Sequence, residues 1–220
     1  MFRFWRSSKP AASTDLSAKL ADEDVRDAVD GVRRFRRQFA ADRVFYNKLA
    51  GSQKPRLLWI GCSDSRVVPD IITSSDPGSL FVVRNIANLV PPAGSGDDSV
   101  GAAIEYALLH LGVDDIVICG HTGCGGVKAM QDGLPGPETH LHRWVKRGAL
   151  PAGLSHLDAV KRNVLAQRNN LLTYAAVRER AAKGSLNIHE WLYDMESGDI
   201  LAFDAETEEW RSLNEVSAES

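Results

Sequence analysis

Short apolar runs alternate with helix-length amphipathic segments over most of the 220 residues of this chain. The runs that predict strands lie at residues 56–60, 80–83, 116–119, 186–193 and 200–203. Strands that read as continuous apolar runs are buried on both faces, which is typical of parallel sheets. A turn at residues 196–199 joins the last two runs as a hairpin. The pattern therefore predicts an α/β fold with a mainly parallel central sheet, an antiparallel edge strand and flanking helices.

Helical periodicity predicts the elements between these strands. Residues 98–111 predict a helix that ends at Gly112, and residues 139–146 predict a short helix within a loop rich in Gly and Pro. A capping-box pattern at Ser155 predicts the start of one long helix that ends at Gly184. The apolar stripe of this long helix comprises Leu157, Val160, Val164, Leu171 and Tyr174.

The segment before the first strand differs in character. Residues 16–50 predict a helical arm, broken near Gly31, in which aromatic residues neighbour a basic run at residues 33–37. An amphipathic arm that precedes a compact domain favours a role in dimerisation. We therefore divide the chain into four parts, which are a flexible tail (residues 1–15), a dimerisation arm (16–50), an α/β domain (51–210) and a C-terminal tail (211–220).

Composition limits the cellular compartments and the classes of partner expected for this chain. A net charge of −3 and a pI near 6.1 give no basic footprint for nucleic acid. No apolar run approaches the roughly 18 residues that a transmembrane helix needs. Three cysteines are a poor framework for disulfides, so a reducing, cytoplasmic location is expected.

Two short motifs, each following a predicted strand, carry the candidate chemistry. One contains Cys62, and the other contains His121 and Cys124. The carboxyl ends of parallel strands meet at one edge of a sheet, which would gather these side chains. No fourth Cys or His has a suitable spacing, so three ligands with one open position predict a catalytic rather than a structural zinc site. Residues 51–210 thus become the zinc-binding catalytic domain, while Cys119 is interpreted as a core thiol.

Asp64 and Arg66 stand beside the first candidate ligand and would share one face of an extended segment. A charge-assisted bond from the guanidinium would keep the carboxylate ionised. Asp64 could then accept a hydrogen bond from zinc-bound water or hydroxide. If the pair breaks, Asp64 could instead fill the fourth zinc position and close the site. The residues alone leave both states open.

The sequences at residues 62–66 (Cys-Ser-Asp-Ser-Arg) and 121–126 (His-Thr-Gly-Cys-Gly-Gly) resemble the two signatures of β-class carbonic anhydrases. The similarity runs from about residue 39 to about residue 203. It is strongest to the bacterial branch associated with cyanate metabolism and to its plant-like relatives. It implies one Zn²⁺ per subunit on Cys62, His121 and Cys124, with Asp64 and Arg66 as the catalytic dyad.

The same resemblance implies the activity and the assembly. Zinc-bound hydroxide would hydrate CO2 reversibly to bicarbonate and a proton, which makes the chain a carbonate dehydratase. The protein would be a homodimer or a higher oligomer that exchanges its N-terminal helices. Two alternatives stay open. One is a hydrolase of carbon disulfide or carbonyl sulfide on the same site. The other is a non-catalytic zinc-binding regulatory protein, which the presence of both dyad residues disfavours.

Other positions match family residues outside the metal site. Gln53 and Gly123 correspond to substrate-binding positions. A regulatory bicarbonate site of one family subtype has matches in Trp59, Arg84 and Tyr193. The Arg-Val-Val-Pro spacing at residues 66–69 instead follows the plant-like branch, so the sequence leaves both the regulation and the proton shuttle open.

Overall fold

The computed structural model describes residues 15, 20 and 23–215, which fall into two compact units divided after Ser52. Apart from Asp15, the flexible tail expected over residues 1–15 lies outside the described residues, as does the part of the C-terminal tail from residue 216. Among the described residues, no helix is long and apolar enough to cross a bilayer.

The first unit contains helices α2 (Glu23–Ala41) and α3 (Arg43–Leu49). The break expected near Gly31 is wrong, because α2 runs through Gly31 without interruption. A single glycine costs a helix only about 1 kcal/mol relative to alanine, which a 19-residue helix tolerates. The break falls at Asp42 instead, where the side chain caps α3 by accepting a hydrogen bond from the Phe45 N–H.

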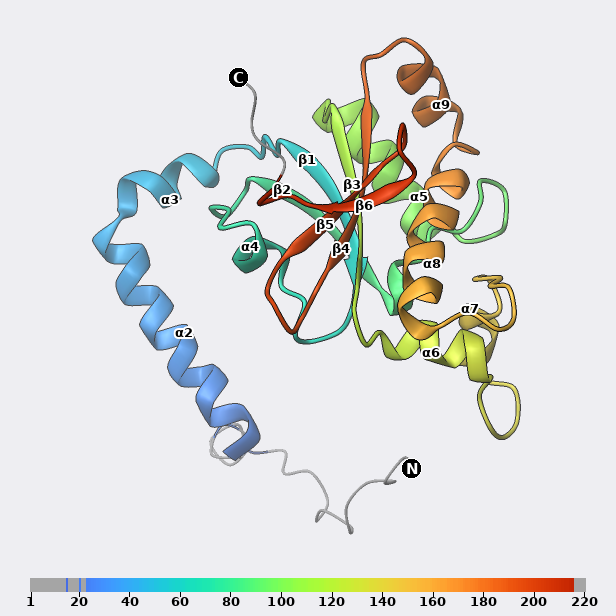
Figure 1. The fold of residues 1–220 in the computed structure, drawn as a ribbon. Helices are drawn as coiled ribbons and strands as arrows, with labels where there is room; N and C mark the ends of the chain where they lie inside the picture. The colour runs from blue at the N-terminus through green and yellow to red at the C-terminus, as the bar shows by residue number, and fades with distance from the viewer. Residues whose placement is uncertain (1–14, 16–19, 21–22, 216–220) are drawn as a thin grey trace. The chain divides into compact units, whose positions relative to one another are not determined.

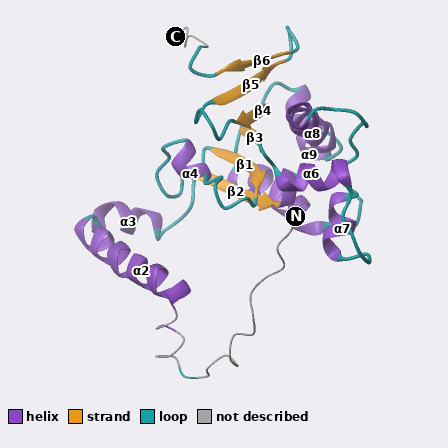
Figure 2. Ribbon diagram, turned by 60° about the horizontal axis from the view of Figure 1, so that its bottom comes forward, coloured by secondary structure: helices purple, strands orange, loops and turns teal. Residues whose placement is uncertain are grey.

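Among the described residues of the second unit, one sheet of six strands has the order β2-β1-β3-β4-β5-β6 (Figure 2). In that order the strands are β2 (Leu80–Asn85), β1 (Leu57–Cys62), β3 (Asp115–His121), β4 (Asn187–Tyr193), β5 (Ile200–Asp204) and β6 (Glu209–Ser212). The first four pair in parallel, and β5 and β6 follow antiparallel to their neighbours. The predicted mainly parallel sheet with an antiparallel edge is confirmed.

The antiparallel edge is wider than expected, because the hydrophobic pattern does not predict β6. The sequence of β6, Glu-Trp-Arg-Ser, has no apolar run to mark it as a strand. It extends the sheet two residues beyond position 210, so Arg211 and Ser212 belong to the sheet and not to the expected C-terminal tail.

The helices and helical turns of the second unit lie between and after these strands. They are α4 (Pro69–Ile72), the 3₁₀ turn η1 (Ile86–Asn88), α5 (Asp98–Glu105) with its π-helical continuation η2 (Tyr106–Leu111), α6 (Gly125–Asp132), α7 (His140–Val145), α8 (His156–Leu171) and α9 (Ala175–Ala182). The predicted stop at Gly112 is confirmed by its left-handed φ of 69°. The short helix expected near residues 139–146 is present as α7, capped by Thr139.

The single long helix predicted from Ser155 to Gly184 is in fact two helices. Ser155 caps α8 as expected, but the chain turns at residues 172–174 before α9 begins. At this turn the hydroxyl of Tyr174 donates to the Pro91 carbonyl, a fixed tertiary bond that the helical periodicity does not encode. Leu157 is 44% exposed and does not belong to the buried stripe.

The main core lies between one sheet face and helices α5, α8 and α9, which cover that face (Figure 1). Ile60 and Ile118 from the sheet belong to one cluster with Val164 of α8 and Val177 of α9. A smaller cluster around Trp59 occupies the other face. This packing fixes β1 and β3 side by side, so their carboxyl ends share one edge of the sheet.

Candidate metal centre

Three buried side chains converge where β1 and β3 end. Cys62 is the last residue of β1, His121 is the last residue of β3, and Cys124 is the N-cap of α6 three residues later. Their ligand atoms all lie within 4.8 Å of one another, and the two Sγ atoms are 3.9 Å apart. The sheet therefore brings together the three residues that the motifs singled out.

The geometry and the donor set fit a tetrahedral zinc ion. Two thiolates on one tetrahedral Zn²⁺, each about 2.3 Å from the metal, are about 3.8 Å apart, close to the separation seen here. The Nδ1–H of His121 donates to the Thr122 carbonyl at 3.0 Å. That bond leaves Nε2 with a free lone pair, and this atom is buried without a hydrogen-bond partner. An orphaned imidazole nitrogen beside two thiols is the arrangement that a zinc ion satisfies.

The two thiols acidify unequally because they interact. A hydrogen bond with Cys124 lowers the pKa of Cys62 to about 4 against the opposing effect of burial, helped by His121 and by the Asp64 and Ala87 N–H groups. The neighbouring Cys62 thiolate and burial raise the pKa of Cys124, although the Gly126 and Val127 N–H groups at the start of α6 lower it.

Asp64 and Arg66 form a bidentate ion pair beside the cluster. The Arg66 Nε and Nη2 atoms donate to the two carboxylate oxygens at 2.9 and 2.7 Å, and the Arg66 backbone N–H donates to Oδ1 at 3.0 Å. The segment is a turn, closed by the Val67 N–H to the Asp64 carbonyl, so the expected extended geometry is wrong although the pairing forms. These bonds hold the pKa of Asp64 well below its usual range. Asp64 Oδ2 lies 3.9 Å from His121 Nε2, next to the metal position.

The residues expected to form a regulatory site lie on the sheet face opposite the main core. Trp59 is fully buried, packs edge-to-face on Trp191, and has an indole N–H without a partner. Tyr193 packs against the same cluster. Arg84 donates to the Cys62 and Asp64 carbonyls at 2.9 and 2.6 Å, so it supports the loop that carries both residues.

The two expected substrate-binding residues lie in different places. Gly123 lines a cavity of about 310 Å³ together with Thr122 and Leu192, beside the metal cluster. Gln53 is exposed and precedes the amino end of β1. A six-residue strand is about 16 Å long, so Gln53 lies near the edge of the sheet opposite to the one that bears Cys62.

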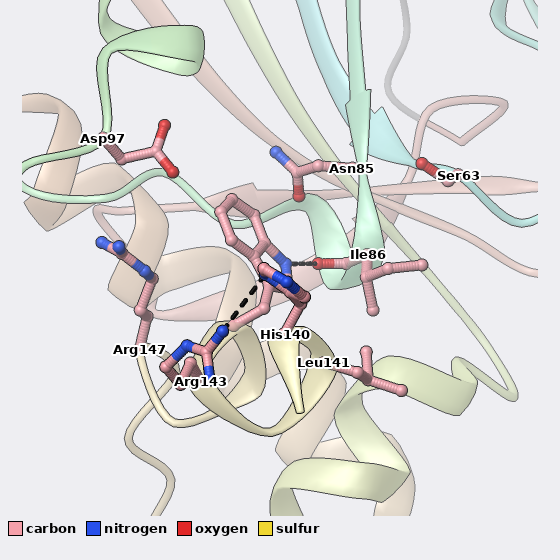
Figure 3. Close-up of a pocket in the computed structure, with 9 residues that line it drawn as sticks. Ser63, Asn85, Ile86, Asp97, His140, Leu141, Arg143 and Arg147 are labelled. Atoms are coloured by element: carbon pink, nitrogen blue, oxygen red, sulfur yellow. Dashed lines mark hydrogen bonds between the residues drawn. The ribbon is translucent and has the colours of Figure 1, made fainter. Parts of the chain in front are cut away.

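A larger cavity of about 590 Å³ opens between the end of β2 and α7 (Figure 3). Ser63 and Ile86 form part of its wall, and the wall contributed by α7 includes Trp144 and Arg143. The Trp144 indole N–H donates to the Ile86 carbonyl at 2.9 Å. Sequence reasoning did not assign Trp144 a role, because an aromatic residue in a predicted short helix carries no signal of its contact.

Comparison with known proteins places this geometry in a family context. A family model described as carbonic anhydrase matches residues 57–200. A carbonic anhydrase of Pseudomonas aeruginosa is 42% identical over 204 residues, which cover 87% of this chain and 93% of the relative. A carbonic anhydrase of Synechocystis is 39% identical, with coverage of 80% of this chain and 70% of the relative.

Solved structures of β-carbonic anhydrases are also similar to this fold. The structure of the β-carbonic anhydrase CcaA superposes with a TM-score of 0.78 at 35% identity, and the match covers 86% of this chain and 92% of that chain. A tetrameric β-carbonic anhydrase of Sordaria macrospora superposes with a TM-score of 0.72 at 31% identity, covering 84% of this chain and 98% of that chain.

Proposed function

Because this chain belongs to the β-class carbonic anhydrase family, we propose that it binds one Zn²⁺ per subunit and hydrates CO2 reversibly to bicarbonate and a proton. The ligands would be Cys62, His121 and Cys124. The observation that carries the proposal is the buried, unpartnered Nε2 of His121, which lies within 4.8 Å of both thiol sulfurs. Zinc held there supplies a Lewis acid that acidifies the attacking water.

Asp64 orients that water rather than deprotonating it. A carboxylate whose pKa is held well below its usual range is a weak base, and an efficient general base has a pKa near the working pH. The ionised group can still accept a hydrogen bond and so direct the oxygen lone pair towards the CO2 carbon. Arg66 fixes both carboxylate oxygens, which makes it the positioning partner of Asp64.

The same dyad supports a second, closed state. In this structure Asp64 is paired with Arg66, yet its Oδ2 is only 3.9 Å from His121 Nε2. Release from Arg66 would let the carboxylate reach the fourth metal position and exclude water. We therefore propose that the Arg66 ion pair favours the active state over the closed one.

The substrate-binding role of Gln53 requires another copy of the chain. Gln53 lies near the amino end of β1, at the sheet edge away from its own cluster, so it can serve a metal site only in an assembly. A homodimer or higher oligomer is the assembly we propose. Gly123, which lines a cavity beside the ligands, would contact substrate within the same chain.

We also propose a regulatory site and a cellular location for this protein. Trp59, Arg84 and Tyr193 would form a bicarbonate site, with the unpartnered indole N–H of Trp59 as its donor. A reducing, cytoplasmic compartment suits the chain, because all three cysteines are free and two of them are needed as thiolates.

Stopped-flow measurement of CO2 hydration by the zinc-loaded protein tests the function. We expect a rate far above the uncatalysed reaction. A parallel assay for hydrogen sulfide released from carbon disulfide or carbonyl sulfide examines the alternative hydrolase. Sulfide release without CO2 hydration would replace the proposal with that hydrolase. A folded protein that contains one zinc per subunit and has neither activity would instead be a non-catalytic zinc protein.

A further inference from the structure

A sharp backbone corner at residues 86–88 lies against the metal cluster. Ala87 and Asn88 adopt left-handed φ values of 63° and 46°, which non-glycine residues rarely adopt, and both are buried. Ala87 belongs to one buried cluster with Cys62 and Cys124, and its N–H is among the groups that lower the pKa of Cys62. The corner thus presents a backbone donor to one of the three metal ligands.

The same corner also packs on the helix that carries the second cysteine. A Cβ atom added to Gly126 would lie 2.8 Å from the Ala87 Cβ and 3.1 Å from the Ala87 nitrogen. Gly126 is in the first turn of α6, and its N–H is among the groups that lower the pKa of Cys124. The position of this one corner therefore affects the surroundings of both thiolates.

Side chains from two other helices hold the corner in its strained conformation. The Asn163 amide of α8 donates to the Ala87 carbonyl at 2.9 Å, and the Trp144 indole of α7 donates to the Ile86 carbonyl at 2.9 Å. Asn163 is buried and is itself held by the Gln167 amide, which donates to it at 2.9 Å. Farther along α8, the Asn170 side-chain amide donates to the Val90 carbonyl at 2.9 Å.

We propose that Asn163 is a positioning residue for the metal site, which acts by holding the Ala87 carbonyl so that the N–H on the other side of the same Cα stays directed at the Cys62 sulfur. This inference rests on the proposed zinc function. A hydrogen bond to a ligating sulfur withdraws charge from it, and its loss makes the thiolate a stronger electron donor to the metal. Loss of a fixed ligand position also weakens binding, as is general for groups that support metal ligands.

The test compares Asn163→Ala with Asn170→Ala in the full-length protein. Asn170 is the matched control. It lies on the same helix and its amide also donates to a backbone carbonyl, but that carbonyl belongs to Val90 and not to the corner. One readout is the zinc affinity in competition with a chromogenic chelator. The other is the thiolate-to-metal absorption band of the Co²⁺-substituted protein, which a purely structural role would not move.

We expect Asn163→Ala to weaken zinc affinity about tenfold or more and to shift the cobalt band to lower energy. Asn170→Ala should leave the affinity within about twofold of wild type and the band unmoved. Trp144→Phe keeps an aromatic ring on α7 and removes only the donor to the Ile86 carbonyl, which shares a peptide group with the Ala87 N–H, so it should show a change in the same direction.

Equal behaviour of Asn163→Ala and Asn170→Ala would overturn the inference. If Asn163→Ala does not fold, Trp144→Phe against Asn170→Ala decides in the same way. A wild-type protein that fails to bind one zinc per subunit would instead refute the proposed function, so the two failures are distinguishable.

Discussion

At the scale of single residues, the ion pair between Asp64 and Arg66 separates orientation from proton transfer. Two charge-assisted bonds at 2.9 and 2.7 Å fix the carboxylate next to the metal position. Because the pKa of Asp64 lies well below its usual range, Asp64 stays ionised throughout the neutral range. Its protonation therefore does not account for any loss of activity between pH 8 and pH 5.

We expect Asp64→Asn to lower kcat for CO2 hydration by about 100-fold, the order of loss that misplacing a reacting group causes. The amide preserves shape but loses the charge that Arg66 holds. Stopped-flow kinetics with measured zinc content is the assay. Asp76→Asn, in an exposed turn remote from the cluster in sequence, is the control and should match wild type. Near wild-type kcat in zinc-replete Asp64→Asn would refute the orienting role.

The three candidate metal ligands could be predicted from the sequence, whereas the residues that surround them could not. Cys62 and His121 lie at the ends of apolar runs, and Cys and His are residue types that commonly bind zinc. Asn163 and Gln167 are polar residues in a helix, a pattern that usually marks a solvated face. Their burial depends on tertiary packing against the segment at residues 87–90, and no local signal records that contact.

At the scale of elements, the contact of η1 with the first turn of α6 sets the spacing around the cluster. We expect Gly126→Ala to destabilise the protein by about 1–3 kcal/mol, the usual cost of overpacking, and to weaken zinc binding. The added Cβ would meet Ile86 Cγ2 and Ala87 Cβ at 2.8 Å. Thermal or urea unfolding and a chelator titration measure the two effects.

Gly125→Ala is the matched control for this substitution. It lies one position earlier in the same helix, and its added Cβ would meet nothing within 4 Å. We expect it to be neutral or slightly stabilising. Equal stability and equal zinc affinity for the two variants would show that the close approach of η1 does not matter.

An ion pair between the half-exposed Arg168 and the buried Glu190 joins α8 to β4. Arg168 Nε lies 2.6 Å from a carboxylate oxygen of Glu190, whose side chain is 8% exposed. Burial raises the pKa of Glu190, against the opposing effect of Arg168. A carboxyl group with a raised pKa stabilises the fold most below its unfolded pKa of about 4, and this stabilisation is lost as pH rises through the folded value.

Arg168→Leu should therefore destabilise the protein by about 1–3 kcal/mol at pH 8, because it leaves a buried carboxylate without its half-exposed, solvent-screened partner. The loss should be smaller at pH 5, where the carboxyl group can protonate. Urea unfolding at the two pH values is the measurement. Adding Glu190→Gln to Arg168→Leu should restore part of the stability at pH 8. A loss that does not depend on pH would show that Glu190 is not the cause.

Hydrophobic periodicity predicts some helix and strand boundaries of this fold and misses others. It predicts the five longest strands and the start of α8, since each buries an apolar face. It misses the break between α8 and α9, which includes the bond from the Tyr174 hydroxyl to Pro91, a residue 83 positions away. It also misplaces the break in the N-terminal arm, where the Asp42 cap starts a new helix and Gly31 interrupts nothing.

At the scale of the whole molecule, the N-terminal unit presents apolar side chains that its own helices do not cover. Val32 and Phe35 are 61% and 48% exposed on α2, and Val44 is 70% exposed on α3. Phe35, Phe39 and Tyr46 form an aromatic cluster with ring centroids 4.8 to 6.2 Å apart. Burial of this surface against a second copy would explain its composition.

We expect the wild-type protein to be a dimer or larger, and Val32→Ser combined with Phe35→Ser to shift it towards monomer. Light scattering after size-exclusion chromatography measures the mass. Activity per subunit should fall with dissociation, since Gln53 would serve only a neighbouring site. Arg36→Ser, a change of an exposed polar residue on the same helix, is the control. A wild-type monomer with full activity would contradict both the assembly and the role of Gln53.

The central claim is that Cys62, His121 and Cys124 form a zinc site that hydrates CO2. The most direct measurement is the initial rate of CO2 hydration, by stopped flow, as zinc is titrated into chelator-stripped protein. We expect a rate that rises in proportion to added zinc and stops rising at one zinc per subunit. A rate at the uncatalysed background at full occupancy, or a rate that is independent of zinc, would contradict it.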